Sequence, residues 1–317
     1  MSNSIQSEHF NLQPLAEGVY AAIATELGAG FSNAGLIDLG DRTLVFDAFE
    51  NPQATADLLK ASLQLTGRRP GTVIISHWHP DHWGGLQIFA DSNILATHAT
   101  RQAMIPLVDE MLQDKRDPST MKQALEETEA RLAVETEPNN RHTLQVSLAH
   151  QRHDLQALPT LEPTLPDQTF EGKLVLHGTH RTAELIATGK GHTISDCVLR
   201  LTQEWVAFIG DTGFFQSQPF MPYGFPEKWV ALLDKMAGWD IDTFVPGHGP
   251  VGSKTDLAFE AKYILALEEL VHGVVQAGGS VDDALRHTLP APFDAWQAVG
   301  QRFEANVRAA YKRHASA

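Results

Sequence analysis

The stretch from Ser76 to Gly85 reads Ser-His-Trp-His-Pro-Asp-His-Trp-Gly-Gly, and the interpretation of the whole chain starts from it. It places three imidazoles and one carboxylate within six positions, at His77, His79, Asp81 and His82. Imidazole and carboxylate are ligands that zinc accepts, and a two-residue spacing lets the first two histidines point the same way on an extended turn. The stretch therefore predicts a metal site.

The residues around this cluster predict where it lies in the fold. Gly71 to Ser76 is a β-branched run typical of a buried strand, and it leads directly into the cluster. Gly84 and Gly85 allow another part of the backbone to approach closely. Upstream, Asn51 and Pro52 are a capping residue and a first helical residue, and the apolar residues after them recur at helical spacing until Gly67. We expect the metal site at a strand end, after one amphipathic helix.

Two β-rich blocks flanked by helical segments predict an α/β (α+β) fold, a four-layer αββα sandwich. The first block has runs at 18–24, 33–39 and 43–48, and the second has runs at 173–176, 184–187, 198–201 and 205–209. We expect residues 1–317 to form a single domain, in which residues 100–160 are an inserted, lid-like segment. Within it, Asp117 and Pro118 open a charged helix, and 137–140 is interpreted as loop.

The last part of the chain, 254–317, is predicted to be a helical cover. Apolar residues there recur at helical spacing in two groups, and the helices that carry them should pack on the sandwich. The groups are Phe259, Tyr263, Leu267, Leu270 and Val274, and Phe293, Trp296, Phe303 and Val307.

The composition of the chain limits the kinds of partner that we expect the protein to bind. The net charge of −15, with only 24 Lys and Arg, leaves no basic stripe for nucleic acid. The opening residues do not resemble a secretory leader, and no apolar run is long enough to span a membrane, so we expect a cytoplasmic protein without membrane contact. Cys197 is the single cysteine, which excludes an internal disulfide and a cysteine-based zinc site. The sequence leaves the oligomeric state open.

The stretch from His77 to Gly85 resembles the signature of the metallo-β-lactamase superfamily, and the other motifs of that family follow in order. Asp47 ends a strand before the cluster, and the downstream motifs are Gly191-His192-Thr193, Gly210-Asp211-Thr212 and Pro246-Gly247-His248-Gly249-Pro250. The resemblance covers roughly residues 16 to 250. It implies the αββα fold with the metals in the cleft between the sheets, in agreement with the pattern of strands and helices.

The resemblance also implies a dinuclear site. Carried over by position, His77, His79 and His192 would bind one ion, and Asp81, His82 and His248 the other, with Asp211 bridging. Two zinc ions are expected, with iron or manganese as alternatives. A water between such ions is acidified towards a pKa of about 7 and would supply the attacking hydroxide. Asp81 would also shuttle a proton, and Asp47 would orient a metal histidine.

The predicted activity is hydrolysis of a small ester, lactone, thioester or amide by a metal-bridging hydroxide. A mononuclear iron sulfur dioxygenase of the same fold, a phosphodiesterase and a non-catalytic metal-binding module are the alternatives. Departures from better-known family members disfavour β-lactams and glutathione thioesters. The 100–160 segment and the apolar loop from Phe214 to Phe225 predict a partly hydrophobic substrate, for which Phe214 and Tyr223 are the candidate contacts.

Overall fold

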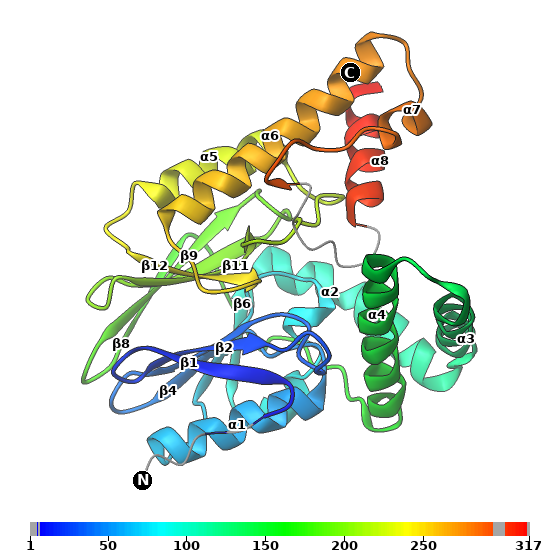
Figure 1. Ribbon diagram of the computed structural model, residues 1–317. Coiled ribbons are helices and arrows are strands. Elements are labelled where there is room, and N and C mark those ends of the chain that lie inside the picture. The colour runs from blue at the N-terminus through cyan, green and yellow to red at the C-terminus, as the bar shows by residue number, and fades with distance from the viewer. Residues whose placement is uncertain (1–4, 6, 294–301, 316–317) are drawn as a thin grey trace.

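The computed structural model describes residue 5, residues 7–293 and residues 302–315. Two sheets pack face to face with helices on their outer surfaces, which confirms the predicted αββα arrangement (Figure 1). The first sheet follows chain order, β1 (Phe10–Ala16), β2 (Val19–Ala24), β3 (Ala34–Asp38), β4 (Thr43–Phe46), β5 (Thr72–Ile74), β6 (Asn93–Thr97) and β7 (Gln168–Phe170). The second has the order β12 (Thr243–His248), β11 (Val206–Phe214), β10 (Asp196–Leu201), β9 (Thr182–Gly189) and β8 (Lys173–His177).

The helices cover both sheets (Figure 1). Helix α1 (Pro52–Thr66) lies against the first sheet, and α5 (Pro226–Ala237) and α6 (Lys254–Gln276) lie against the second. Between β6 and β7 the chain forms α2 (His98–Arg116), α3 (Ser119–Val134) and α4 (Pro138–Ala157). The C-terminal part holds α7 (Val281–Leu285) and α8 (Arg302–Ala315).

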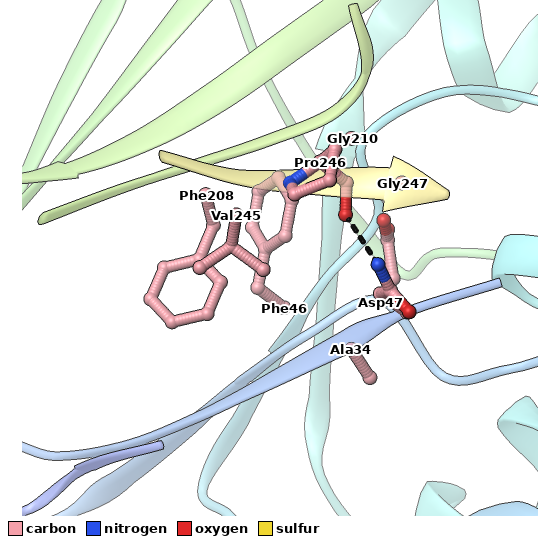
Figure 2. A pocket seen from close by; sticks show the side chains of 9 residues that line it. Ala34, Phe46, Asp47, Phe208, Gly210, Val245, Pro246 and Gly247 are labelled. Carbon is pink, nitrogen blue, oxygen red and sulfur yellow. Dashed lines mark hydrogen bonds between the residues drawn. The ribbon is translucent and has the colours of Figure 1, made fainter. Parts of the chain in front are cut away.

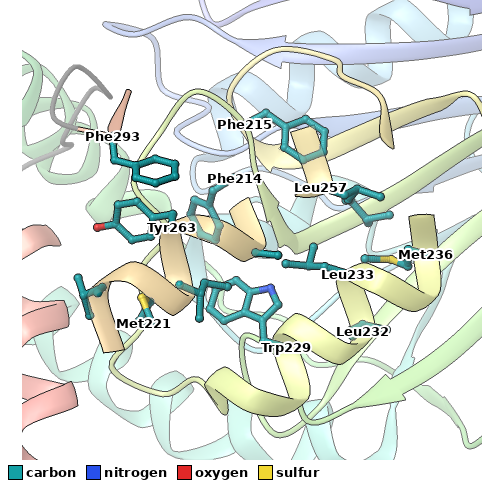
Figure 3. Close-up of a cluster of buried hydrophobic side chains, with 14 of the residues drawn as sticks. Phe214, Phe215, Met221, Trp229, Leu232, Leu233, Met236, Leu257, Tyr263 and Phe293 are labelled. Atoms are coloured by element: carbon teal, nitrogen blue, oxygen red, sulfur yellow. The ribbon is translucent and has the colours of Figure 1, made fainter. Parts of the chain in front are cut away.

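Buried apolar side chains fill three layers. One lies between the sheets, where Phe46 of β4 meets Phe208 of β11 with ring centroids 6.1 Å apart. A second joins α1 to the first sheet. The third joins α5 and α6 to the second sheet, and Figure 3 shows Trp229 and Leu233 from α5 beside Tyr263 from α6. The strands that carry the site are therefore held on both faces.

Helix α1 forms where the capping residues predict it. The Asn51 side chain accepts a hydrogen bond from the backbone N–H of Gln53, and Pro52 is the first helical residue. Gly67 ends the helix with a φ of 69°, a conformation that glycine adopts without strain. These local signals confirm the predicted bounds of this helix.

Parallel strands bring the site residues to one edge of both sheets. β4, β5 and β6 run parallel, as do β11 and β12. The carboxyl ends of parallel strands meet at the same edge, so Asp47 after β4 and His77 after β5 lie close to His248 at the end of β12.

Three expectations about secondary structure need correction. Residues 137–140 are not loop, because Glu137 caps α4 and its side chain accepts a hydrogen bond from the N–H of Asn140. Phe214 is not in the loop, because it is the last residue of β11. Phe293 precedes α8 instead of sharing its face, and Trp296 lies outside the described residues. Among the described helices, none is both long and apolar enough to cross a membrane.

Candidate metal centre

Four buried side chains form a first group that can hold a metal ion, His77, His79, His192 and Asp211, with their ligand atoms within 4.8 Å of one another. His77 and His79 follow β5, His192 lies between β9 and β10, and Asp211 is in β11. Asp211 Oδ2 is 3.6 Å from His77 Nε2 and 3.3 Å from His192 Nε2. His79 Nδ1 lies 3.0 Å from His192 Nε2. Three segments distant in sequence thus converge on one point.

A second group shares Asp211 and adds Asp81, His82 and His248, again with ligand atoms within 4.8 Å of one another. Asp211 Oδ1 is 3.0 Å from His82 Nε2 and 3.5 Å from His248 Nε2. Asp81 Oδ2 is 3.1 Å from His248 Nε2. The two carboxylate oxygens of Asp211 therefore face two different groups, and the two groups together contain the seven residues predicted as ligands.

Buried polar atoms without partners show that a cation fits these groups. His77 Nε2, His82 Nε2 and Asp211 Oδ1 are buried and make no hydrogen bond. Leaving such atoms unpaired is costly, whereas coordination of one divalent cation in each group would satisfy all three. A set of nitrogen and oxygen donors without thiolate suits zinc and also accepts iron or manganese.

Further polar side chains hold the histidine rings in place. Asp47 Oδ2 lies 2.8 Å from His82 Nδ1, and Asp47 Oδ1 accepts a hydrogen bond of 2.8 Å from the N–H of Ser76. Ser76 Oγ is 3.0 Å from His77 Nδ1. Both rings therefore present Nε2 to the groups. Asp47 adopts a φ of 61°, which Asp tolerates better than most residues.

Glycines at the site have no room for a side chain. A Cβ on Gly247 would lie 1.9 Å from Asp211 Oδ1, and a Cβ on Gly84 would lie 2.0 Å from the carbonyl oxygen of Glu50. The close backbone approach expected after the histidine cluster is therefore present at Gly84.

Electrostatics keep three of the donors, His77, His79 and Asp211, in the forms that bind metal. Burial, together with the charge of His82, lowers the pKa of His77 well below its usual value. Burial and the charge of His192 lower the pKa of His79 to about 3. Burial raises the pKa of Asp211, but the charges of His82 and His248 outweigh it and hold that pKa well below the usual range. The first pair of imidazoles is thus neutral and the carboxylate ionised, as ligation requires.

Aromatic rings form a wall beside His79. The ring centroids of Trp78 and His79 are 4.3 Å apart. The ring centroid of Tyr223 is 5.5 Å from that of His79 and 4.9 Å from that of Trp78. Phe220 lies 6.0 Å from the ring of His79. We call Trp78, Phe220 and Tyr223 the aromatic wall. Tyr223 is 53% exposed, so the wall extends from the site to the surface.

The other candidate contact, Phe214, lies against His248. Its ring stacks on that of His248 with centroids 5.0 Å apart and an interplanar angle of 13°. It is fully buried and belongs to the core under α5 and α6. Phe214 therefore supports a site histidine and reaches solvent nowhere.

Sequence reasoning missed several residues near the site. Asp196 accepts hydrogen bonds of 3.0 Å from the N–H and 2.5 Å from the hydroxyl of Thr193, and so fixes the loop of His192. Its place three residues after a threonine is a signal that could have found it. The ring of Phe31 lies 5.6 Å from that of His248 and 4.6 Å from that of His150 in α4, a contact that no local pattern predicts.

A small cavity lies next to the site, between the two sheets (Figure 2). Asp47, Gly210 and Asn33 line it, and the side-chain amide of Asn33 donates a 3.0 Å hydrogen bond to the carbonyl oxygen of Pro246. Its volume of about 10 Å³ is only that of one water. This cavity is too small to accept a substrate.

The family model described as the metallo-beta-lactamase superfamily matches residues 27–248. The chain therefore belongs to the metallo-β-lactamase superfamily. With its two groups of His and Asp side chains it is a metal-dependent hydrolase of that fold. Both conclusions confirm the predictions made from the motifs. Comparison with curated proteins gives no match.

Solved structures with this fold differ strongly from the chain in sequence. A metallo-β-lactamase from Pontibacter korlensis is 14% identical with a TM-score of 0.57, and 81% of this chain aligns with 99% of it. The metallo-β-lactamase FIM-1 from Pseudomonas aeruginosa, in a mono-zinc form, is 13% identical with a TM-score of 0.56, covering 81% of this chain and 95% of that one. The stereoselective inverting sec-alkylsulfatase Pisa1 from Pseudomonas sp. is 15% identical with a TM-score of 0.66, covering 96% of this chain and 50% of that one.

Proposed function

We propose that the protein is a dinuclear zinc hydrolase that cleaves a small, partly hydrophobic ester, lactone, thioester or amide. The observation that carries this proposal is the position of Asp211, whose two oxygens face two separate groups of buried histidines. A single-ion site would need only one of these groups. The seven side chains would hold two ions and leave each an open position.

Bound zinc would supply an acidified water and a Lewis acid for the scissile carbonyl. The chain's own residues supply orientation and proton transfer. Asp81 directs Oδ2 towards His82 and His248, at 3.3 and 3.1 Å, which leaves Oδ1 to accept a proton. Burial raises the pKa of Asp81, but the charges of His82 and His248 hold it well below the usual range, so this carboxylate is ionised. Asp47 fixes the ring of His82 during the reaction.

The aromatic wall supports a substrate with an apolar part. Three rings beside His79 offer stacking surface, and Tyr223 extends it outwards. The hydrophobic group would lie against this wall, with the scissile bond over the metal ions. The helices between β6 and β7 would act as a lid over this space.

The alternatives predict different metals and substrates. An iron sulfur dioxygenase would use one ion, and the complete second group argues against it. A phosphodiesterase is disfavoured by the net charge of −15. A non-catalytic module has no need of two complete donor groups. Sulfate esters belong in the substrate panel, because the sec-alkylsulfatase aligns with 96% of this chain.

The test combines elemental analysis of the purified protein with turnover on esters, lactones, thioesters, amides, β-lactams, sulfate esters and phosphodiesters. Two zinc ions per chain with hydrolysis of one of the first four classes would support the proposal. One iron per chain without hydrolysis would refute it in favour of the oxygenase. Asp211→Ala should abolish turnover, and Asp234→Ala, at an exposed position in α5, is the control.

A further inference from the structure

A buried arginine beside the candidate metal centre has no acidic partner among the described residues. Arg302 is only 7% exposed, and its Nη1 donates hydrogen bonds to Ser217 Oγ at 3.2 Å and to the carbonyl of Gln218 at 2.9 Å. Both acceptors are neutral. Among residues 7–293 and 302–315, no carboxylate lies within ion-pair distance of Arg302. The Nε and Nη2 atoms of Arg302 make no hydrogen bond to any of these residues. Burying a guanidinium in this way is costly and needs a reason.

The position of Arg302 relates it to the site. Its guanidinium carbon lies 5.2 Å from the ring centroid of Phe214, and the same ring stacks on His248 at 5.0 Å. One aromatic ring, that of Phe214, therefore contacts both the guanidinium and a histidine of the second group. Asp211 and Asp81 also act on it electrostatically, opposing the lowering of its pKa by burial.

The solvent exposure of the donors shows which side of the centre is open. His79, Asp81 and His248 are 8–9% exposed, whereas His77, His82 and His192 are at most 1% exposed. A substrate must approach from the side of the first three residues. Arg302 lies within electrostatic range of two of these three residues, His248 and Asp81.

The charge balance at the loaded centre favours an anion. Two divalent ions would bring four positive charges, and Asp47, Asp81, Asp211 and the attacking hydroxide would together balance them. Arg302 adds a further positive charge in a region of low dielectric constant. An oxyanion on the substrate would compensate this excess, and the planar guanidinium is suited to bind it with two parallel hydrogen bonds.

We propose that Arg302 is a specificity-determining residue that binds a singly charged oxyanion, such as a carboxylate, on the substrate. The apolar part of the same substrate lies against the aromatic wall. This inference rests on the proposed hydrolase function and narrows its substrates to amphipathic anions. A purely structural role for Arg302, holding the loop at Ser217 and Gln218, would not discriminate between charged and neutral ligands.

The kinetic test uses the zinc-loaded full chain and two esters, mono-4-nitrophenyl glutarate, which is anionic, and 4-nitrophenyl butyrate, which is neutral. Wild type should prefer the anionic ester in kcat/KM. Arg302→Gln should lower the ratio of the two kcat/KM values at least about tenfold, the effect of one lost charge-assisted hydrogen bond. Arg308→Gln, in the same helix but exposed and paired with Glu304, should leave the ratio unchanged.

A binding test separates this inference from the hydrolase proposal. Calorimetry on the zinc-loaded protein compares 4-phenylbutyrate with neutral 4-phenylbutanamide in the same variants. A selective loss of 4-phenylbutyrate affinity in Arg302→Gln supports the anion site even if neither ester is hydrolysed, in which case only the hydrolase proposal fails. An unchanged affinity and ester ratio overturn the inference. If Arg302→Gln does not fold, Arg302→Lys decides, since loss of the planar fork should still weaken 4-phenylbutyrate and an unchanged affinity refutes the site.

Discussion

Replacing Asp47 by Asn tests the charge-assisted hydrogen bond behind His82. Asp47 is 1% exposed, and its Oδ2 lies 2.8 Å from His82 Nδ1. Asn tolerates the φ of 61° at this position, and its side-chain oxygen can still accept the hydrogen bond from the N–H of Ser76. The amide nitrogen then faces His82 Nδ1, so the substitution removes both the negative charge and the acceptor that holds this ring with Nε2 free for metal. A charge-assisted hydrogen bond contributes about 1.5–3 kcal/mol, which corresponds to roughly 10- to 150-fold in affinity for the second ion.

The assay is an equilibrium zinc titration against a chromophoric chelator, which resolves the two dissociation constants. In Asp47→Asn the dissociation constant of the ion bound by the second group should rise by this factor. The ion bound by the first group should keep an affinity near that of wild type. Asp38→Asn is the control, because Asp38 ends β3 and pairs with Arg68 at 2.9 Å. Equal weakening of both ions, or no weakening of either, would refute the role assigned to Asp47.

Three further predictions concern the same centre. Gly247→Ala should displace the Asp211 carboxylate, since the new Cβ would lie 1.9 Å from its Oδ1, and metal content measured by elemental analysis should fall below one ion per chain. Chelation should lower the Tm by roughly 10 °C in a calorimetric scan, because ions present at 1,000 times their Kd contribute about 4 kcal/mol each; an unchanged Tm would contradict binding at the buried donors. In the metal-free protein, burial and the charge of His192 lower the pKa of His79 to about 3 from 6.5. The unfolded chain then binds more protons between these values, so stability to urea should fall as the pH drops from 7 to 4, and a flat profile would oppose this.

Local signals were sufficient wherever one short segment decides its own structure. The capping residues predict α1 because Asn51 and Gly67 act on the nearest backbone groups. The histidine cluster predicts a metal site because the donors His77, His79 and His82 are adjacent in the chain. Motif order then predicted the seven residues found in the two groups, and family membership and fold agree with it.

Local sequence patterns failed to predict the structure where packing between distant segments determines it. Residues 137–140 and the prolines after them suggested a loop, yet Pro138 suits the first turn of a helix. Helix α4 is held by contacts far away in sequence, since His142 Nε2 lies 2.6 Å from a Glu26 carboxylate oxygen and His150 Nε2 lies 3.1 Å from the Glu26 carbonyl. No local pattern contains that information.

The sequence by itself determined the kinds of donor, their order along the chain and the layered fold, because capping, periodicity and ligand spacing act over a few residues. Only the tertiary structure decided which faces meet at the centre. It buried Phe214 against His248 and brought Arg302, from the last described helix, against the same Phe214 ring. Such placement depends on the packing of elements about 90 residues apart in the chain. No single short segment determines the energy of that packing.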